Sequence, residues 1–328
     1  MRPTGLLHIG HLVGALGNWV PLQDTYDCFY FVADWHALTS EFADTTRLTA
    51  NAFENVADWI GAGLDPNKCT FFVQSLVPEH AELYLLLSMV VPVPWLERVP
   101  TYKEQQENLK DKDLSSIGFL GYPLLQTADV AMYDASFVPV GEDQVAHLEV
   151  AREVVRRFNN FFRGSGGKDV LVEPQPLLTS FGRLPGLDGD KKMSKSLGNT
   201  IHLSDSAEEV SKKVRQMYTD PKRVRADIPG TVEGNPVFVY HDAFNPDKAE
   251  VEDLKARYRA GKVGDVEVKT KLARALNAYL DPIRERRAAA LARPGDLREM
   301  LFEGSKRARS VAAGTMARVR EAVKLNYA

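Results

Sequence analysis

The sequence has 328 residues, a formal net charge of −3, and 26% charged and 44% hydrophobic residues. This length favours two domains, and the ordinary composition excludes disordered and fibrous proteins. The longest charge-free apolar run, residues 83–96, contains two prolines and is too short to span a membrane. The only cysteines are Cys28 and Cys69, which argues against a disulfide framework or a cysteine zinc site and favours a reducing, cytoplasmic location.

The charges are distributed unevenly along the chain. From residue 284 onward there are eleven Lys or Arg against five Asp or Glu, so this part carries +6 and the preceding part −9. A basic C-terminal part favours contact with a polyanion, although a solvated helix face is the commoner reason for such a pattern.

The first two-thirds of the chain alternates strand and helix patterns. Residues 28–33 read as a buried strand, a helix follows from about residue 45 to 63, and residues 70–73 read as the next strand. Such a strand–helix–strand unit predicts a parallel sheet with covering helices. Residues 79–91 and 102–112 predict two helices of an insertion, after which residues 137–140 form a strand that leads into another helix.

After about residue 200 the strand signals thin out. Amphipathic helices are predicted over residues 207–218, 248–260, 266–289 and 297–325. A long connection with Pro and Gly, residues 220–236, joins the first two. The pattern therefore predicts an α/β domain followed by an all-helical domain.

Two short segments carry the strongest chemical signals. The histidine segment, residues 4–11 (TGLLHIGH), places His8 and His11 around Gly10 at a helix start. Backbone N–H groups and the helix dipole favour anions there, and imidazoles donate hydrogen bonds, so the segment suits a phosphate-bearing ligand. Two capping or core histidines are the alternative interpretation.

The lysine segment, residues 190–199 (DKKMSKSLGN), combines three lysines with serines and a glycine. A cationic loop of this kind can close on a triphosphate and stabilise departing pyrophosphate. By itself, a solvated surface loop is the commoner fate of such a run.

Together, His-Ile-Gly-His and Lys-Met-Ser-Lys-Ser resemble the two signatures of class I aminoacyl-tRNA synthetases. Within that class, the chain resembles the tryptophanyl-tRNA synthetases over essentially its whole length. The resemblance is carried by Tyr122, residues 127–129 (TAD), 138–144 (VPVGEDQ), His147, Glu149, 157–159 (RFN), 34–39 (DWHALT), 73–75 (VQS) and 77–80 (VPEH).

The resemblance implies a Rossmann-like parallel sheet with helices on both faces as the catalytic domain, residues 1–200. It places an insertion at about residues 76–120 and a helical tRNA anticodon-binding domain at residues 201–328. The implied reaction activates L-tryptophan with ATP and transfers it to tRNA(Trp).

The resemblance assigns catalysis to His8, His11, Lys192 and Lys195. The implied ATP site comprises Thr4, His8, Gly10, His11, Gly141, Asp143, Lys192, Met193, Ser194 and Lys195. The histidines would contact phosphates, Gly10 the adenine face, the lysines the β- and γ-phosphates, and Asp143 the ribose. Mg²⁺ would accompany ATP, held mainly by phosphate oxygens, and no protein metal site is expected.

For tryptophan the implied site comprises Asp129, Tyr122, His36, Gln126, Val138, Val140 and Gln144. An indole has one N–H donor and no acceptor, so a carboxylate such as Asp129 would select for it. Without the resemblance, Asp129 reads as a surface acid and His36 as a core histidine.

The chain departs from the usual family pattern at its beginning. Family members usually have a β-strand before the histidine segment, which supplies part of the tryptophan pocket. We therefore expect either a trimmed sequence or a missing first strand. Arg2 stands where glutamine is common, and Gln126 where methionine is frequent.

Two other functions remain open at this point. One is tyrosine specificity on the same scaffold, which residues 140–144 (VGEDQ) favour less than tryptophan. The other is a binding or regulatory paralogue that no longer charges tRNA, against which the intact lysine segment and Asp129 argue.

Two surfaces are predicted to bind macromolecules. The apolar run over residues 83–96, ending in Trp95-Leu96-Glu97-Arg98, favours a homodimer interface, as does the resemblance. Basic side chains of the last helix, Arg307, Arg309 and Arg318, are expected to contact tRNA phosphates. In the alternative interpretation these arginines belong to a helix that docks onto the α/β domain.

Overall fold

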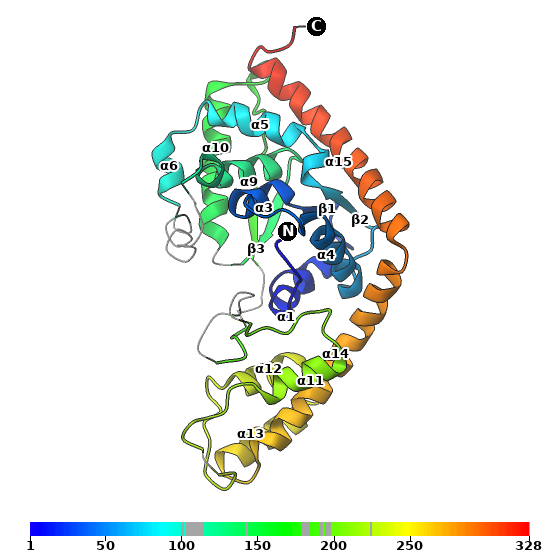
Figure 1. The fold of residues 1–328 in the computed structure, drawn as a ribbon. Helices are drawn as coiled ribbons and strands as arrows, with labels where there is room; N and C mark the ends of the chain where they lie inside the picture. The colour runs from blue at the N-terminus through cyan, green and yellow to red at the C-terminus, as the bar shows by residue number, and fades with distance from the viewer. Residues whose placement is uncertain are drawn as a thin grey trace.

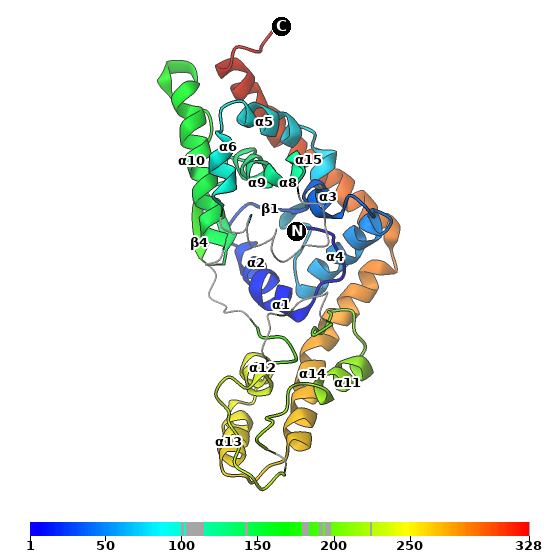
Figure 2. The same ribbon diagram turned by 60° about the vertical axis from the view of Figure 1, so that its left-hand side comes forward.

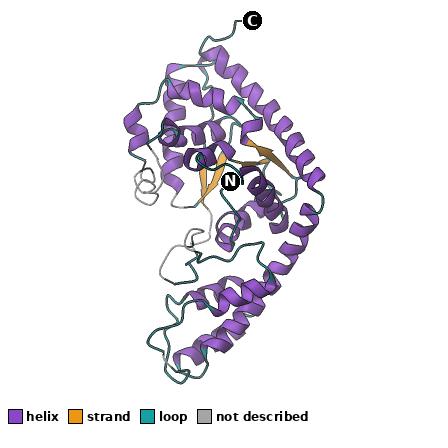
Figure 3. Ribbon diagram, in the orientation of Figure 1, coloured by secondary structure: helices purple, strands orange, loops and turns teal. Residues whose placement is uncertain are grey.

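The computed structural model describes residues 1–99, 102, 115–141, 144–178, 184–189, 193, 198–223 and 225–327. The helix expected over residues 102–112 lies, except for Tyr102, outside these residues. The same holds for four predicted ATP-site residues, Asp143, Lys192, Ser194 and Lys195. The described chain forms two lobes, and the strands lie in the lobe that contains the N-terminus (Figure 1, Figure 3).

The predicted strand–helix–strand unit is confirmed. Strands β1 (Cys28–Val32) and β2 (Cys69–Val73) pair in parallel, with α4 (Leu48–Ala62) between them in sequence. The register places Cys28 opposite Cys69, and both cysteines are buried and free. Helix α4 ends at Gly63, whose φ of 112° suits a residue without a Cβ.

A second parallel pair extends the α/β lobe. The predicted strand β3 (Phe137–Val140) pairs with β4 (Gln175–Leu178), which the sequence pattern did not predict. The amphipathic helix α10 (Val145–Phe161) connects them. Parallel strands joined by helices are thus present in both halves of this lobe.

Alternate side chains of β1 enter two different cores. Cys28, Tyr30 and Val32 belong to a buried cluster with residues of α4, whereas Phe29 and Phe31 pack against the second cluster. The helices that contribute to the second cluster are α5 (Glu79–Ser88), α9 (Tyr122–Ala131), α10 and α15 (Pro294–Ala322). This period-2 division confirms helices on both faces of the strands.

The second lobe is helical, as expected. It comprises α11 (Ala207–Arg215), α12 (Pro236–Phe244), α13 (Lys248–Arg259) and the first half of α14 (Asp265–Leu291). Helix α12 was not predicted because six of the nine side chains in PVFVYHDAF are buried and only Asp242 and Ala243 are exposed, so no regular polar face marks its period. Helix α14 runs from this lobe to the α/β lobe (Figure 2).

The last helix does not remain with the helical lobe. After α14 has led the chain to the α/β lobe, helix α15 lies along that lobe and packs against β2 (Figure 1). A Cβ built at Gly304 would overlap the carbonyl oxygen of Phe71, so helix and strand backbones touch. Ser305 Oγ accepts the N–H of Val73 at 3.2 Å and donates to Leu301 O at 2.7 Å. The packing therefore departs from the expected division at residue 200.

Shorter helices and turns complete the described chain. They are α1 (Ile9–His11), the π-turn η1 (Leu12–Leu16), α2 (Gly17–Leu22), α3 (Asp34–Glu41), η2 (Gln74–Leu76), α6 (Val93–Glu97), α8 (Ile117–Leu120) and η4 (Ser165–Gly167). Over the described ranges, none of the helices combines the length and apolar character needed to cross a membrane.

Candidate active site

The histidine segment forms a reciprocal cap at the start of α1. His8 Nδ1 accepts the N–H of Gly10 at 3.1 Å, and His11 Nδ1 accepts the N–H of His8 at 3.2 Å. The two ring centroids are 3.8 Å apart. Because each Nδ1 accepts, the proton of each neutral ring is assigned to Nε2, which makes Nε2 a hydrogen-bond donor. The arrangement can thus present two imidazole N–H donors to an anion.

Gly10 lies at a crowded point of this segment. A Cβ at this position would lie 2.8 Å from His8 Cε1 and Nδ1 and 3.1 Å from the sulfur of Met193. Any larger residue would have to displace the His8 ring, so the geometry accounts for the glycine. The contact also brings Met193, a buried residue of the lysine segment, against the histidine segment.

Backbone hydrogen bonds join residues 7–9 of the histidine segment to residues 201–203, which lie far away in the sequence. Ile9 N–H donates to Ile201 O at 3.0 Å, and Leu203 N–H donates to Leu7 O at 3.0 Å. Between these bonds, His8 and His202 form an antiparallel bridge. Residues 201–203 follow the lysine segment after Thr200, so this ladder holds the chain that leaves the lysine segment beside the histidine segment.

The predicted tryptophan residues are arranged on four elements. Tyr122, Gln126 and Asp129 recur at helical spacing along one face of α9. Val138 and Val140 lie two residues apart, and so on one face, in β3. His36 lies on α3, and Gln144 is the N-cap residue of α10. The backbone N–H of Gln144 donates to Gly141 O at 2.9 Å, in the turn that follows β3.

Asp129 is the centre of a buried polar network. His36 Nε2 lies 2.9 Å from Asp129 Oδ2, and His80 Nδ1 lies 2.6 Å from Oδ1. Gln74 Nε2 donates to both carboxylate oxygens, at 2.8 and 3.0 Å. His80 Nε2 in turn lies 2.7 Å from the hydroxyl of Tyr133. The network ties α3, η2, α5 and α9 together through one carboxylate.

Burial and hydrogen bonding act in opposite directions on Asp129. Burial alone would raise the pKa of its carboxyl group, but the hydrogen bonds from His36 and His80 hold that pKa well below its ordinary value. Asp129 is therefore ionised at neutral pH. A carboxylate accepts about four hydrogen bonds, and the three donors already make four contacts with Asp129, two of them from the single Gln74 Nε2.

A cavity of about 420 Å³ opens beside this network, between β1 and β3. Asp129 and Val138 line it, together with Tyr133 and the residues of β1 from Cys28 to Phe31. The other five predicted tryptophan residues do not line it. Its walls are largely aromatic and aliphatic and include three aspartates, Asp27, Asp129 and Asp134, which suits an amphipathic aromatic ligand.

The sequence pattern did not assign a role to Gln74, His80 or Tyr133. Gln74 and His80 were noted only within segments that resemble the family. Each contacts Asp129 or its partner from an element distant in sequence, so no local spacing could identify the contact. Among the described residues, no group of three or more His, Cys, Asp or Glu is placed to hold a metal ion.

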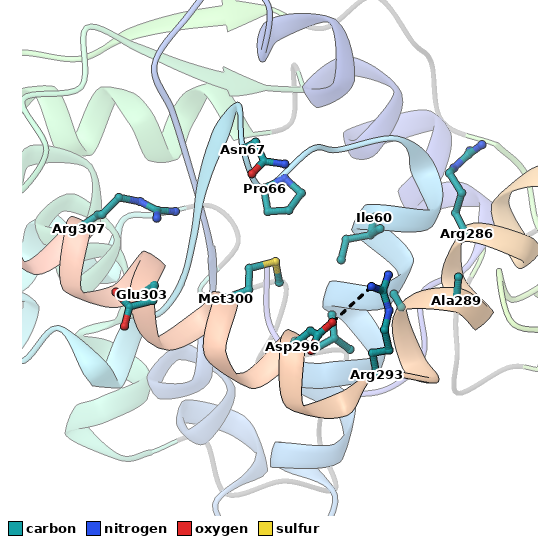
Figure 4. Close-up of a pocket in the computed structure, with 12 residues that line it drawn as sticks. Ile60, Pro66, Asn67, Arg286, Ala289, Arg293, Asp296, Met300, Glu303 and Arg307 are labelled. Atoms are coloured by element: carbon teal, nitrogen blue, oxygen red, sulfur yellow. Dashed lines mark ion pairs between the residues drawn. The ribbon is translucent and has the colours of Figure 1, made fainter.

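The C-terminal arginines lie along α15, and Arg318 pairs with Asp134, which lines the cavity described above. Arg309 Nε donates to Glu79 Oε1 at 2.9 Å, and Arg318 Nη2 donates to the carboxylate of Asp134 at 2.6 and 2.7 Å. Arg307 makes no ion pair or hydrogen bond with the described residues and lines a cavity of about 570 Å³ between α4, α14 and α15 (Figure 4). These contacts favour the interpretation that Arg309 and Arg318 dock α15 onto the α/β lobe.

Comparison with known proteins agrees with this geometry. The family model for tRNA synthetases class I (W and Y) matches residues 1–281. A tryptophan--tRNA ligase from Treponema pallidum is 49% identical, over 99% of this chain and 95% of the relative. One from Thermotoga maritima is 48% identical, over 100% and 98%.

A solved structure is also similar over nearly the whole chain. It is the tryptophanyl-tRNA synthetase of Campylobacter jejuni in complex with ADP and tryptophan, with a TM-score of 0.86, 33% sequence identity, and coverage of 99% of this chain and 98% of that chain. The resemblance inferred from the two signature segments is thereby confirmed. The chain belongs to the class I tRNA synthetases of the tryptophan and tyrosine family.

Proposed function

We propose that this chain activates L-tryptophan with ATP to tryptophanyl-adenylate and then transfers the tryptophanyl group to tRNA(Trp), with release of pyrophosphate and AMP. The observation that carries the proposal is the ladder that joins residues 7–9 of the histidine segment to residues 201–203, which come shortly after the lysine segment in the sequence. Relatives that match this chain over its full length are tryptophan ligases, which favours tryptophan over tyrosine.

The first step is an in-line displacement. A carboxylate oxygen of tryptophan bonds to the α-phosphorus of ATP, and the bond from that phosphorus to the bridging oxygen of pyrophosphate breaks. The protein supplies position and charge rather than a covalent partner. In our proposal His8 and His11 donate from Nε2 to phosphate oxygens, and Lys192 and Lys195 neutralise the departing pyrophosphate.

The remaining contacts hold the nucleotide and its ion. Thr4, Gly10 and Met193 border the nucleotide on the histidine side, whereas Gly141 and Asp143 meet the ribose after β3. Ser194 joins the lysines at the phosphates. Mg²⁺ suits ATP phosphate oxygens, which supply the hard ligands it prefers. Bound there, it would neutralise charge on the phosphates.

Recognition of tryptophan is assigned to the buried network. The Asp129 carboxylate accepts the indole N–H, which phenylalanine lacks. His36 orients that carboxylate, Tyr122, Gln126, Val138 and Val140 shape the pocket, and Gln144 meets the polar end of the amino acid. The support for this assignment is that α9 and β3 present these side chains on single faces.

Tryptophan-dependent exchange of radiolabelled pyrophosphate into ATP tests the proposal directly. We expect exchange with tryptophan and little with tyrosine, followed by attachment of tryptophan to tRNA(Trp). Exchange that favours tyrosine would reassign the specificity. No exchange with either amino acid, from a folded protein, would favour the binding paralogue.

A homodimer is part of the proposed function. Leu85 on α5, Met89 directly after α5 and Val93 on α6 are 52%, 70% and 52% exposed, which is unusual for side chains of this size. Light scattering at micromolar concentration should give twice the chain mass of 36.5 kDa. A mass near that of one chain would contradict the dimer. We place the enzyme in the cytoplasm, where its tRNA and ATP are found.

A further inference from the structure

Helix α14 binds two acidic residues, Asp205 and Asp58, one near each side of the ladder between residues 7–9 and 201–203. Arg284, on α14, donates from Nε to Asp205 O at 2.9 Å. The carboxylate of Asp205 accepts the N–H of His202 at 2.9 Å and the ammonium group of Lys213 at 2.5 Å. Through Asp205, Arg284 therefore fixes the strand of the ladder that follows the lysine segment.

The other strand is approached from one turn farther along α14. Arg287 donates from Nε to Asp58 Oδ1 at 2.7 Å and from Nη2 to Glu54. Asp58 is fully buried, and the backbone N–H of Leu7 lies near enough to favour its charged form. Arg287 therefore binds the face of α4 that also holds the backbone leading into the histidine segment.

Helix α4 contributes further contacts from the face that bears Asp58. Asn51 Nδ2 donates to Pro3 O at 3.2 Å, and Asn55 Nδ2 lies 3.5 Å from Arg2 O. Positions 51, 55 and 58 lie on one face of a helix because they are four and three residues apart. The backbone leading to His8 is thus held along α4, and α14 packs directly on α4.

We propose that Arg284 and Arg287 are positioning residues that set the register between the histidine and lysine segments, and thereby build the phosphate-binding part of the ATP site. The inference rests on the proposed function. Residues three apart on a helix share a face, so a single turn of α14 anchors both strands. Neither arginine needs to contact the substrates.

The choice of arginine is consistent with this role. Each guanidinium group spans more than one acceptor. Besides Asp205 O, Arg284 donates from Nη2 to Asn277 Oδ1 at 2.7 Å and from Nη1 to Asp281, and Arg287 joins Asp58 to Glu54. A lysine ammonium is a compact charge without this fixed fork. Lysine variants should therefore retain part of the function, and glutamine variants less.

The test compares Arg284→Gln and Arg287→Gln with Arg274→Gln as the matched control. Arg274 lies on the same helix and pairs only with Glu250, far along the chain from the ladder. We expect each of the first two variants to reduce kcat/KM for ATP in pyrophosphate exchange by about 10- to 100-fold. The Kd of tryptophan, measured by equilibrium binding, should stay unchanged, and the control should match wild type.

Two further measurements separate positioning from general stabilisation. The fold-decrease in kcat/KM for ATP of the double variant should be smaller than the product of the two single fold-decreases, because both residues act on the same backbone pairing. Arg284→Lys and Arg287→Lys, which keep the charge, should recover part of the lost kcat/KM, and they replace the glutamine variants if those do not fold.

Two outcomes would overturn the inference. In one, the folded variants have a lower free energy of unfolding but wild-type kcat/KM for ATP. In the other, the variants lose affinity for tryptophan by the same factor as they lose kcat/KM for ATP. Failure of the proposed function itself would show differently, as wild-type protein without tryptophan-dependent exchange.

Discussion

His80 Nδ1 lies 2.6 Å from Asp129 Oδ1, and both side chains are buried. On the other side of the ring, His80 Nε2 contacts the hydroxyl of Tyr133, whose pKa is raised by burial. Tyr133 therefore remains protonated and donates to Nε2, which leaves the imidazole proton on Nδ1, facing Asp129. The relay from Tyr133 through His80 keeps Asp129 an ionised acceptor.

The first prediction concerns tryptophan selection. Asp129→Ala should weaken tryptophan binding by about 1.5–3 kcal/mol or more, because a charge-assisted hydrogen bond is lost in a buried site. His80→Gln should act in the same direction, since it breaks the relay from Tyr133. The Kd of tryptophan and the KM of ATP report this separately. Unchanged tryptophan affinity in Asp129→Ala would refute the assignment.

The second prediction concerns the lysine segment. Lys195→Ala should lower the rate of adenylate formation by about 10²- to 10³-fold, because one charge that stabilises the departing pyrophosphate is removed. Tryptophan binding should remain nearly intact. Single-turnover kinetics with a normal chemical step but weakened ground-state binding of ATP would be inconsistent with this role.

The third prediction concerns tRNA. If Arg307, Arg309 and Arg318 contact phosphates, replacing all three with Gln should weaken tRNA binding and flatten its salt dependence while leaving pyrophosphate exchange unchanged. Arg307→Gln alone should show most of that effect, because Arg309 and Arg318 already bind Glu79 and Asp134. Wild-type charging and salt dependence in the triple variant would exclude these residues from the RNA site.

The fourth prediction concerns the contact between α15 and β2. Gly304→Ala should lower the free energy of unfolding by about 1–3 kcal/mol, because its Cβ overlaps Phe71 O. Gly314→Ala, on the same helix and with no atom within 4 Å of the added Cβ, should instead raise it by about 0.5–1 kcal/mol. Equal effects of the two substitutions in chemical denaturation would contradict the close approach.

The fifth prediction concerns pH. Burial raises the pKa of Asp58 to about 6, although Arg287 opposes the rise. A carboxyl group whose pKa is higher in the folded state stabilises the fold below its ordinary pKa and loses that contribution as the pH rises through the folded value. The free energy of unfolding of wild type, relative to Asp58→Asn, should therefore fall by up to about 3 kcal/mol between about pH 4 and pH 6.5. A pH-independent difference between the two proteins would contradict the raised pKa.

Elements with a clear hydrophobic period were predictable from the sequence. Strands β1, β2 and β3 and helices α4, α10 and α14 occur where the patterns placed them, within a few residues. Helix α12 and strand β4 were not predicted. The former exposes only Asp242 and Ala243 and so has no regular polar face. The latter is the short run QPLL with a proline at its second position, which weakens any strand signal.

The residues of the candidate site were likewise predictable only where a local sequence motif contains them. His8 and His11 could be found because a short motif carries their chemistry within four residues. The partners of Asp129 could not, because Gln74 and His80 reach it from 55 and 49 residues away in sequence. Likewise, the charge pattern did not indicate that Arg309 and Arg318 form ion pairs with carboxylates of the α/β lobe, since these pairs depend on how α15 packs.

The contact of α15 with β2 also sets an order of events during synthesis. The strand is complete at residue 73, whereas the helix that covers its edge ends only at Ala322. Until some 230 further residues have left the ribosome, Val73 N–H lacks the Ser305 hydroxyl that accepts it in the finished fold. An uncovered strand edge invites pairing with other chains. The nascent protein therefore passes through a long interval in which its oldest strands are open to aggregation, and the last helix to emerge ends that interval.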